Sequence, residues 1–419
     1  MNTRHGRADR AEWPHPTDFA APPTHADRDR WHEADRAARP VRLEALRSRM
    51  SREGVDGYFG VRWEHMRYLT GIPFDEDEVT GSGDSGKFLI TGTESIVLAD
   101  SRYTVAIKRD APESRVFECY NALAERWAEL TKDAGVTRVA VEAMAIPHLT
   151  WERLQAAAPD VELVAVEGWV EAIREVKEPS EIERIAAACA VADRALATLL
   201  PSIRPGVTER ELALDLEWRI RTGGAERLAF AVTCLGGPEA ALPHGSPGDR
   251  PVRSGEVLLF DFGAQVAGYR SDMTRTLFVG EPAERDLAVY GVVAAAQDGV
   301  FAALQRALTT AAQDSVTPLP EGPAMDALAR SIIEADGRWP AYGHGLGHGI
   351  GLATHELPGL GRRSPNVPLP SPTVFSIEPG IYLEGETGVR IEDLVALDAA
   401  RARLDQLTRF PSGVVVVAV

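Results

Sequence analysis

Residues 257–272, VLLFDFGAQVAGYRSD, combine an apolar run with two acids. The run 257–260 predicts a buried strand that continues directly into Asp261, and Asp272 follows eleven residues later. If residues 263–269 contain a hairpin turn, the two carboxylates lie nearly opposite one another on adjacent strands. Facing anions repel one another unless a cation lies between them. Alternatively, each acid ends a strand in solvent or pairs with Arg270 or Arg275.

The same arrangement recurs nearer the C-terminus. The runs 375–377 and 389–391 lead into Glu378 and Glu392, and Gly385 lies midway between the two acids. A hairpin that turns at Gly385 would place the two glutamates side by side. Four acids among Val, Ile, Leu and Phe would carry a large desolvation cost. A pair of metal ions could offset this cost, so the two acid pairs together predict a metal centre.

A third stretch, YGHGLGHGIG at 342–351, is rich in glycine and histidine, and His355 follows seven residues after His348. Alternating glycines allow the backbone to approach a ligand closely. Phosphate binding is an alternative, but the stretch lacks the Lys-Ser/Thr ending of phosphate-binding loops. Histidine is the commonest metal-ligating side chain. Four carboxylates and one imidazole form an oxygen-rich set that suits Mn²⁺ or Co²⁺, with Zn²⁺ or Fe²⁺ possible.

The length of 419 residues predicts two domains. Residues 1–40 lack a sustained apolar period, which predicts an extended or disordered arm. Residues 41–170 predict an α/β domain, with helices at 42–52 and 123–133 and strands at 88–90, 95–99, 139–141 and 163–166. Ser180 is the expected N-cap of a helix at 181–200, which places a domain boundary just before it.

Residues 176–419 predict a second, α+β domain. Thr208 and Glu211 have the spacing of a capping box ahead of a helix that reaches about residue 221. Further helices are expected at 284–308 and 324–335, between extended runs and Gly/Pro turns. The run 414–417 predicts a closing strand.

The composition excludes several classes of partner. A net charge of -17, from 62 acidic and 45 basic residues, argues against nucleic-acid binding, which needs a basic face. Three widely spaced cysteines favour a reducing compartment. We find no run near the ~18 apolar residues of a membrane span and no apolar signal core, so we expect a soluble, cytoplasmic protein without a membrane partner.

Five motifs together resemble those of aminopeptidase P and prolidase, which are pita-bread metallopeptidases. They are DFG at 261–263, SDMTRT at 271–276, HGLGHG at 344–349, IEPGIY at 377–382 and RIED at 390–393. The resemblance continues upstream through ALPH at 241–244 and KEPSEI at 177–182. It implies a pita-bread α+β catalytic domain preceded by a creatinase-type α/β N-terminal domain, assembled as a homodimer.

The resemblance also implies a site with two divalent metal ions, most often Mn²⁺. Asp272 and Glu392 would bridge both ions, Asp261 would complete one site, and His348 with Glu378 would complete the other. Glu378 would also move the proton of the attacking water.

Other residues match roles around the metals. The resemblance implies that His244 and His355 donate hydrogen bonds to the substrate carbonyl and the developing oxyanion, and that His344 lines the pocket for the proline ring. We expect Tyr382 and Arg390 to orient the metal-binding carboxylates.

The expected reaction is hydrolysis of the bond between an N-terminal residue and a following proline. The substrate is an Xaa-Pro dipeptide or a longer peptide. Arg362 and Arg363 could bind the C-terminal carboxylate of a dipeptide, or they could be solvated cations.

Three alternatives have the same fold. A methionine aminopeptidase normally lacks the N-terminal domain. A creatinase-like hydrolase of a small non-peptide amide lacks the full set of ligands. An inactive peptide-binding module has lost its metal ligands, and a metal assay would distinguish it from an enzyme.

Overall fold

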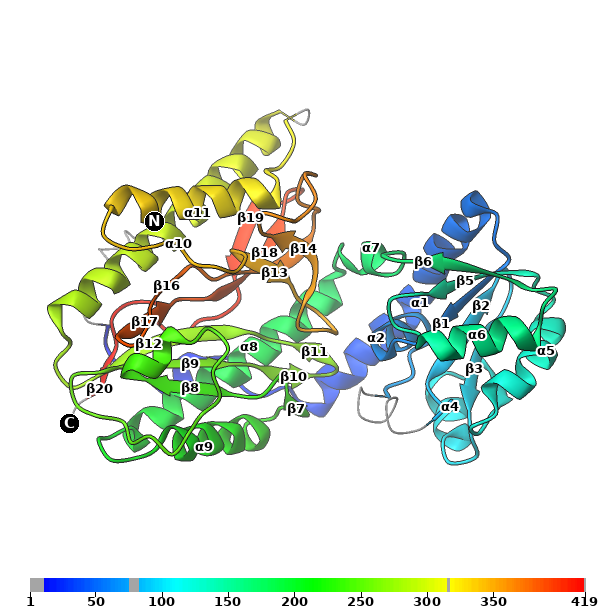
Figure 1. Ribbon diagram of the computed structural model, residues 1–419, viewed down its shortest axis with the longest axis horizontal. Coiled ribbons are helices and arrows are strands. Elements are labelled where there is room, and N and C mark those ends of the chain that lie inside the picture. Colours follow the sequence, from blue (N-terminus) through cyan, green and yellow to red (C-terminus); the bar gives the residue numbers. More distant parts are fainter. Residues whose placement is uncertain (1–10, 75–82, 315–316, 418–419) are drawn as a thin grey trace. The chain divides into compact units, whose positions relative to one another are not determined.

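The computed structural model describes residues 11–74, 83–314 and 317–417. These residues form two compact units (Figure 1). The small unit comprises residues 29–174, and the large unit comprises residues 11–28 together with 175–417. The division between Arg174 and Glu175 lies beside the boundary that the sequence predicts.

A six-stranded sheet in the order β4-β3-β2-β1-β5-β6 forms the centre of the small unit. Its strands are β1 (Gly57–Gly60), β2 (Lys87–Thr91), β3 (Ser95–Ala99), β4 (Arg115–Glu118), β5 (Arg138–Glu142) and β6 (Glu162–Val166). Strands β1, β5 and β6 are parallel neighbours, whereas β2 is antiparallel to both β1 and β3. The four strands predicted in this region are confirmed.

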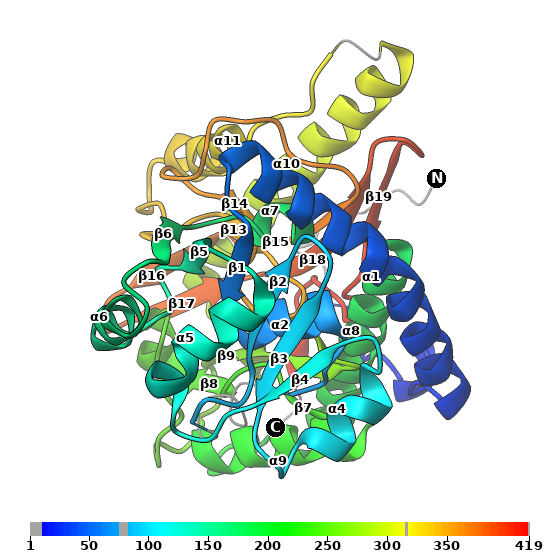
Figure 2. The ribbon, with the colours of Figure 1, turned by 90° about the vertical axis from the view of Figure 1, so that its right-hand side faces the viewer.

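Helices cover both faces of this sheet (Figure 2). They are α1 (His25–Glu53), α2 (Trp63–Thr70), α4 (Thr104–Asp110), α5 (Leu123–Ala134), α6 (His148–Ala157) and α7 (Glu171–Arg174). Phe59 of β1 packs edge to face on Trp127 of α5, with ring centroids 4.9 Å apart. On the other face, Tyr58 stacks on Trp169, which lies under Arg49 of α1. Alternate residues of β1 therefore pack on opposite faces of the sheet.

The prediction of an extended or disordered arm over residues 1–40 is wrong for its second half. Helix α1 begins at His25 and continues through Pro40. The helix has no continuous apolar stripe and is held by polar contacts instead. Arg39 pairs with Glu113, and Arg42 donates to the Tyr68 carbonyl oxygen at 3.0 Å. Both arginines are buried. A hydrophobic pattern cannot reveal a helix that is held in this way. Residues 1–10 of the predicted arm lie outside the described residues.

The large unit is built from four sheets and confirms the α+β prediction. Their orders are β20-β12-β9-β8, β14-β13-β15-β18-β19, β11-β10-β7 and β16-β17. The strands are β7 (Arg227–Leu228), β8 (Thr233–Gly236), β9 (Val257–Phe262), β10 (Ala264–Val266), β11 (Tyr269–Arg270), β12 (Met273–Val279), β13 (Gly347–Gly349), β14 (Glu356–Leu360), β15 (Thr373–Ile377), β16 (Gly380–Leu383), β17 (Thr387–Arg390), β18 (Asp393–Asp398), β19 (Arg403–Gln406) and β20 (Val416–Val417). The predicted closing strand is confirmed at 416–417.

Four long helices pack on these sheets: α8 (Pro179–Leu199), α9 (Glu209–Thr222), α10 (Glu284–Gln313) and α11 (Gly322–Asp336). All four were predicted, as was the capping box of Thr208 and Glu211. The N-cap of α8 is Glu178 and not Ser180, because Pro179 occupies the first turn and Glu178 forms a reciprocal capping box with Glu181. Short 3₁₀ turns complete the chain: η1 (Pro16–Asp18), η2 (Leu200–Ser202) and η3 (Gly237–Ala241).

The segments Pro179–Ser202 and Glu284–Gln313 are long and apolar enough to cross a membrane by length and composition alone. The expectation that no stretch approaches this composition is therefore wrong. Of their most apolar windows, 67% and 50% respectively are buried within the protein. This burial is typical of the core helices of globular domains.

The beginning of the described chain belongs to the large unit and packs against its C-terminal segment. The Trp13 indole N–H donates to the Val416 carbonyl oxygen at 2.8 Å, and the Ala11 amide donates to the Val414 carbonyl oxygen at the same distance. The ring of Phe19 stacks on that of Phe410. Residues 11–28 therefore belong to the same core as the C-terminus.

Candidate metal centre

The first pair of acids comes from the antiparallel strands β9 and β12. Asp261 lies opposite Thr274 in their ladder, and Asp272 immediately precedes β12. The two acids are thus nearly opposite, as predicted. Between them, β10 and β11 form a hairpin whose turn residues, Ala267 and Gly268, both have positive φ. Such a turn matches the twist of the flanking strands.

The second pair of acids lies where one β-ladder ends and the next begins. Ile377 pairs with Asp393 in the β15–β18 ladder, and Gly380 pairs with Arg390 in the β16–β17 ladder. Both ladders have the same register, so Glu378 and Glu392 are directly opposite in the gap between them. The connection from β16 to β17 passes through Gly385, which has a φ of 72°. The predicted hairpin is confirmed.

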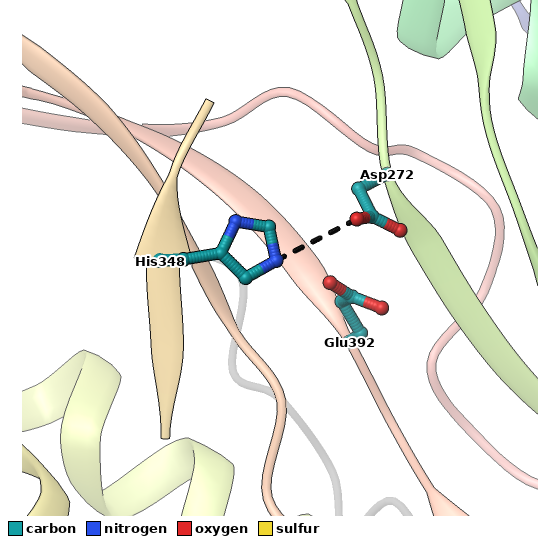
Figure 3. Close-up of side chains that lie close together, drawn as sticks. All are labelled: Asp272, His348 and Glu392. Atoms are coloured by element: carbon teal, nitrogen blue, oxygen red, sulfur yellow. Dashed lines mark ion pairs between the residues drawn. The ribbon is translucent and has the colours of Figure 1, made fainter. Parts of the chain in front are cut away.

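These acids converge on one histidine of β13. One potential ligand atom from each of Asp272, His348 and Glu392 lies within 4.8 Å of the other two (Figure 3). The Nε2 atom of His348 is 3.6 Å from Asp272 Oδ2 and 3.4 Å from Glu378 Oε1. Side chains from β13, from the residue before β12 and from the gap between the two ladders therefore meet at one point.

Burial makes this cluster electrostatically unfavourable on its own. Burial, followed by repulsion from Glu392, Asp261 and Glu378, raises the pKa of Asp272 well above its ordinary value. Burial and the charges of Glu378 and Asp261 likewise raise the pKa of Glu392. Burial also raises the pKa of Glu378. A cation among these groups would stabilise their ionised forms.

The unsatisfied atoms of the cluster fit a metal ion. One buried oxygen on each of Asp261, Asp272 and Glu392 has no hydrogen-bond partner among the described residues. The Nδ1 atom of His348 lies 3.0 Å from the Gly349 carbonyl oxygen, which can only accept, so Nδ1 carries the proton. Burial lowers the pKa of His348, which keeps the ring neutral. Its Nε2 lone pair therefore faces the carboxylates, an arrangement that suits a bound cation and is repulsive without one.

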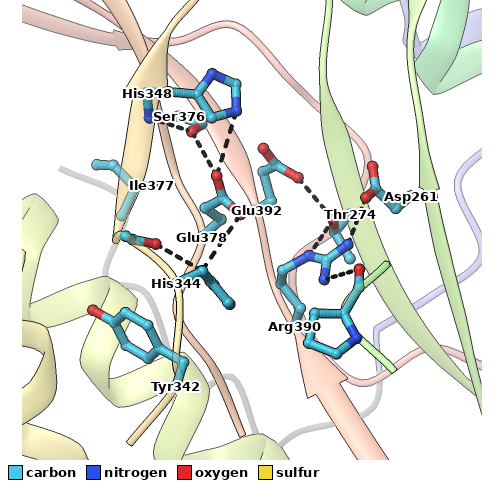
Figure 4. Close-up of polar contacts among 12 residues, drawn as sticks. Asp261, Thr274, Tyr342, His344, His348, Ser376, Ile377, Glu378, Arg390 and Glu392 are labelled. Atoms are coloured by element: carbon cyan, nitrogen blue, oxygen red, sulfur yellow. Dashed lines mark hydrogen bonds and ion pairs between the residues drawn. The ribbon is translucent and has the colours of Figure 1, made fainter. Parts of the chain in front are cut away.

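Arg390 connects the far acid to the rest of the cluster (Figure 4). Its NH2 group donates to Asp261 Oδ2 at 2.5 Å, and its Nε donates to Thr274 Oγ1 at 2.8 Å. Its NH1 group donates to the Tyr382 hydroxyl at 3.0 Å. The partner of Asp261 is thus Arg390, whereas Arg275, which the sequence offered as an alternative, pairs with the buried Asp393 at 2.6 Å.

His344 lies on the opposite side of Glu378 from His348. Its Nδ1 bonds the Gly345 carbonyl oxygen at 2.7 Å, so its Nε2 accepts from the Tyr382 hydroxyl at 2.9 Å. Its Nδ1 is 4.0 Å from Glu378 Oε2. Tyr342 packs beside the ring, with centroids 5.0 Å apart. His344 is therefore a neutral ring held between two aromatic side chains, and burial lowers its pKa.

His355 and His244 are more open to solvent than the cluster itself. The His355 ring packs against that of His348, with centroids 4.3 Å apart. Partial burial, followed by the nearby His348 and His244, lowers the pKa of His355 to about 4. Both rings thus lie on the side of the cluster that solvent reaches.

Arg362 and Arg363 are exposed in the loop after β14. Neither forms an ion pair with another described residue. Their exposure therefore fits both interpretations that the sequence left open, which are binding of a substrate carboxylate and solvated cations.

Three further residues hold the cluster in place, and the sequence analysis missed two of them, Thr274 and Ser376. Thr274 donates to Glu392 Oε2 at 2.7 Å, and Ser376 donates to Glu378 Oε1 at 3.1 Å. Arg275 donates to the Glu392 carbonyl oxygen at 2.5 Å. Thr274 follows Asp272 by two positions and Ser376 precedes Glu378 by two. The period of a strand places such residues on one face and could have identified them.

Comparison with known families agrees with this geometry. The profile of metallopeptidase family M24 matches residues 183–399. The chain belongs to metallopeptidase family M24. The profile of the creatinase/prolidase N-terminal domain matches residues 42–176, so the small unit and the catalytic unit both have their expected fold. All five predicted metal ligands lie within the M24 region.

Several relatives of this M24 protein cover most of its length. An uncharacterised peptidase of Bacillus subtilis is 33% identical over 85% of this chain and 95% of its own. The Xaa-Pro dipeptidase of Pyrococcus horikoshii is 32% identical over 83% of this chain and 92% of its own. Among solved structures, the Xaa-Pro dipeptidase from Bacillus anthracis covers 90% of this chain and 99% of its own, with a TM-score of 0.80 and 30% identity. The X-Pro aminopeptidase from Thermotoga maritima covers the same shares, with a TM-score of 0.77 and 33% identity.

Proposed function

We propose that this metallopeptidase hydrolyses the bond between an N-terminal residue and a following proline, with two divalent metal ions. The observation that carries the proposal is the convergence of Asp272, Glu378 and Glu392 on the Nε2 side of His348. In addition, Asp261, Asp272 and Glu392 each have one buried oxygen without a hydrogen-bond partner among the described residues. We assign Asp272 and Glu392 to both ions, Asp261 to one, and His348 with Glu378 to the other. The oxygen-rich set favours Mn²⁺.

Two bound divalent ions would supply a water of lowered pKa and would polarise the scissile carbonyl. Glu378 would accept the proton of that water and pass it to the leaving nitrogen, because its carboxylate lies in the cluster beside His348. The Ser376 hydroxyl, which donates to Glu378 Oε1, fixes the carboxylate in its orientation. His355 and His244 donate hydrogen bonds to the carbonyl oxygen as negative charge develops on it.

The proline side of the substrate is assigned to His344. Its ring is fixed by Tyr382 and the Gly345 carbonyl oxygen, so it presents a rigid, neutral wall beside Glu378. Proline has no amide hydrogen, and its ring is compact and fixed. A rigid wall would therefore select it by shape. Xaa-Pro peptidases among the relatives support this substrate class.

We further propose that the enzyme acts as a dipeptidase, with Arg362 and Arg363 binding the free C-terminal carboxylate. These two cations are exposed and have no described acidic partner, so they are available to a substrate. A cytoplasmic location is proposed because all three cysteines are free and buried.

The decisive experiment is steady-state cleavage of Ala-Pro, Ala-Pro-Ala and Met-Ala by apo-protein reloaded with Mn²⁺, Co²⁺ or Zn²⁺. We expect Ala-Pro to be cleaved fastest, in proportion to metal occupancy up to two ions per chain. Faster cleavage of Ala-Pro-Ala would change the assignment to an aminopeptidase. Faster cleavage of Met-Ala would reject proline selection but retain the metallopeptidase, and failure to bind metal would indicate a binding module.

A further inference from the structure

The carboxylate of Glu356 packs against the backbone of the loop that carries His355. Residues 350–355 join β13 to β14, and Glu356 follows at the start of β14. Its Oε1 accepts the Ala353 amide at 2.7 Å. A Cβ atom on Gly351 would lie 2.8 Å from its Oε2, so the carboxylate packs directly against the backbone of that glycine. Glu356 thus contacts two residues of the loop whose last residue is His355.

A buried lysine neutralises this carboxylate. Lys177 Nζ lies 3.1 Å from Glu356 Oε2, and the two side chains are 1% and 6% exposed. The Lys177 amide donates to the Pro372 carbonyl oxygen at 2.8 Å, which fixes the lysine backbone immediately before the N-cap of α8. Removing one member of a buried ion pair leaves an uncompensated charge, which the surrounding structure must rearrange to solvate.

The rest of the loop is anchored to the backbone and side chain of Arg270. The Arg270 amide donates to the Gly351 carbonyl oxygen at 2.8 Å, and its guanidinium donates to Thr354 Oγ1 at 3.0 Å. These bonds hold Gly351 and Thr354, whereas Glu356 holds Ala353. Glu356 and Lys177 therefore constrain a further point of the same loop.

We propose that Lys177 and Glu356 are positioning residues, which fix the loop so that His355 reaches the developing oxyanion. The inference rests on the proposed function, in which His355 is the catalytic donor. A hydrogen-bond donor stabilises a transition state only if it is held in place before the charge develops. A displacement of about 1 Å can reduce turnover by about a hundredfold. His355 immediately precedes Glu356 in the chain, so the buried pair holds the backbone from which the exposed His355 side chain projects.

The test begins with three variants of the metal-loaded enzyme: Lys177→Met, Glu356→Gln, and the double variant. We expect each single variant to lower kcat for Ala-Pro by about ten- to a hundredfold with little change in KM. The double variant should recover part of this loss, since neither charge is then left unpaired. Arg219→Met, which breaks the half-buried pair of Arg219 and Asp215 on α9, is the control and should leave kcat unchanged. A double variant as poor as the product of the two single losses would overturn the proposal.

A second comparison separates positioning from general damage. In a His355→Ala background, Lys177→Met should cost no further kcat, because the residue that it positions is already gone. A further loss as large as in the wild-type background would reject the inference. If the wild-type enzyme itself cleaves no Xaa-Pro peptide, the proposed function fails, which is a different result from active enzyme with additive losses.

A measurement without substrate completes the test. The Ala353 amide is bonded to Glu356, so Lys177→Met should accelerate hydrogen exchange in the peptide covering 350–356 by at least about tenfold. Exchange in peptides of α10 should match the wild type. If Lys177→Met does not fold, Glu356→Gln provides the same comparison, since it also removes the ion pair between residues 177 and 356. Unchanged exchange in a folded variant would show that the pair does not constrain the loop.

Discussion

Glu378 and Glu392 lie directly opposite one another, in a gap between two ladders of identical register. Neither residue belongs to a strand, yet the strands on both sides fix where each one projects. Both carboxylates project from this gap toward His348, while the strands on either side of the gap remain paired (Figure 4). Burial raises the pKa of both acids, and repulsion from Glu378 adds to the rise for Glu392. The paired strands therefore hold the carboxylates in fixed positions, although the strands themselves do not neutralise the negative charge of these carboxylates.

Replacing either proposed bridging residue should remove both metal and activity. We expect Asp272→Asn or Glu392→Gln to reduce occupancy below two ions per chain, because two cations would then face one another with less negative charge between them. Metal analysis and Ala-Pro cleavage on the same samples measure the effect. Glu386→Gln, in the exposed β16–β17 turn, is the matched control. Full occupancy with normal turnover would reject the bridging assignment.

Arg390→Met should weaken metal binding even though Arg390 is not a ligand. The substitution removes the donor that holds Asp261 Oδ2, and loss of such an orienting partner typically costs about ten- to a hundredfold in metal affinity. Calorimetric titration of apo-protein with Mn²⁺ would measure it. Arg390→Lys should not rescue the affinity, since an ammonium cannot bind Asp261, Thr274 and Tyr382 in one plane. Wild-type affinity in both variants would contradict this role.

His355→Ala should lower kcat by about a hundredfold, the scale observed when one oxyanion donor is lost. Metal content should remain at the wild-type value, because the ring packs on His348 and does not belong to the ligand cluster. Parallel measurements of turnover and metal content make the comparison. A loss of bound metal would instead make His355 a ligand.

His344→Ala should impair cleavage of Xaa-Pro substrates selectively. The variant removes the ring that Tyr382 holds beside Glu378, while the metal ligands stay in place. We expect kcat/KM for Ala-Pro to fall by about ten- to a hundredfold, the range for a contact that shapes a binding pocket. The ratio of Ala-Pro to Met-Ala cleavage should fall with it. An unchanged ratio would mean that the proline ring binds elsewhere.

The stability of the large unit should decrease as pH rises from about 4 to about 7. Burial raises the pKa of Asp193 from 3.8 to about 7. In this window the folded protein keeps a proton that the unfolded chain releases, so stability is lost with rising pH, by up to about 4 kcal/mol. Urea unfolding of wild type and Asp193→Asn at several pH values would isolate the contribution. Equal slopes for the two proteins would show that Asp193 ionises normally.

Much of the centre could be predicted because its ligands follow regular elements. A strand that runs into an acid fixes the direction of that acid, and Gly385 marks the turn that brings Glu378 back toward Glu392. These rules depend only on neighbours in the sequence. They were sufficient to place both acid pairs, whereas the link to His348 came from the glycine- and histidine-rich stretch and the resemblance to known metallopeptidases.

Other features depend on contacts between distant residues, which the sequence does not display. The part of helix α1 before the predicted helix at 42–52 was missed because Arg39 holds it through Glu113, and such a partner has no periodic signature. The pairing of Lys177 with Glu356 joins residues 179 positions apart. Ser180 was assigned as N-cap because serine is a common cap, whereas the neighbouring glutamates form the capping box.

The bond between Trp13 and Val416 joins residues 403 positions apart, and it has a consequence for how the protein is made. The polypeptide emerges from the ribosome N-terminus first, so residues 11–28 must wait for the last strand to appear before they can dock. The small unit, encoded entirely between these two segments, can fold during that interval. A fragment that begins at residue 175 would therefore lack the Trp13 bond to Val416 and the packing of Phe19 on Phe410.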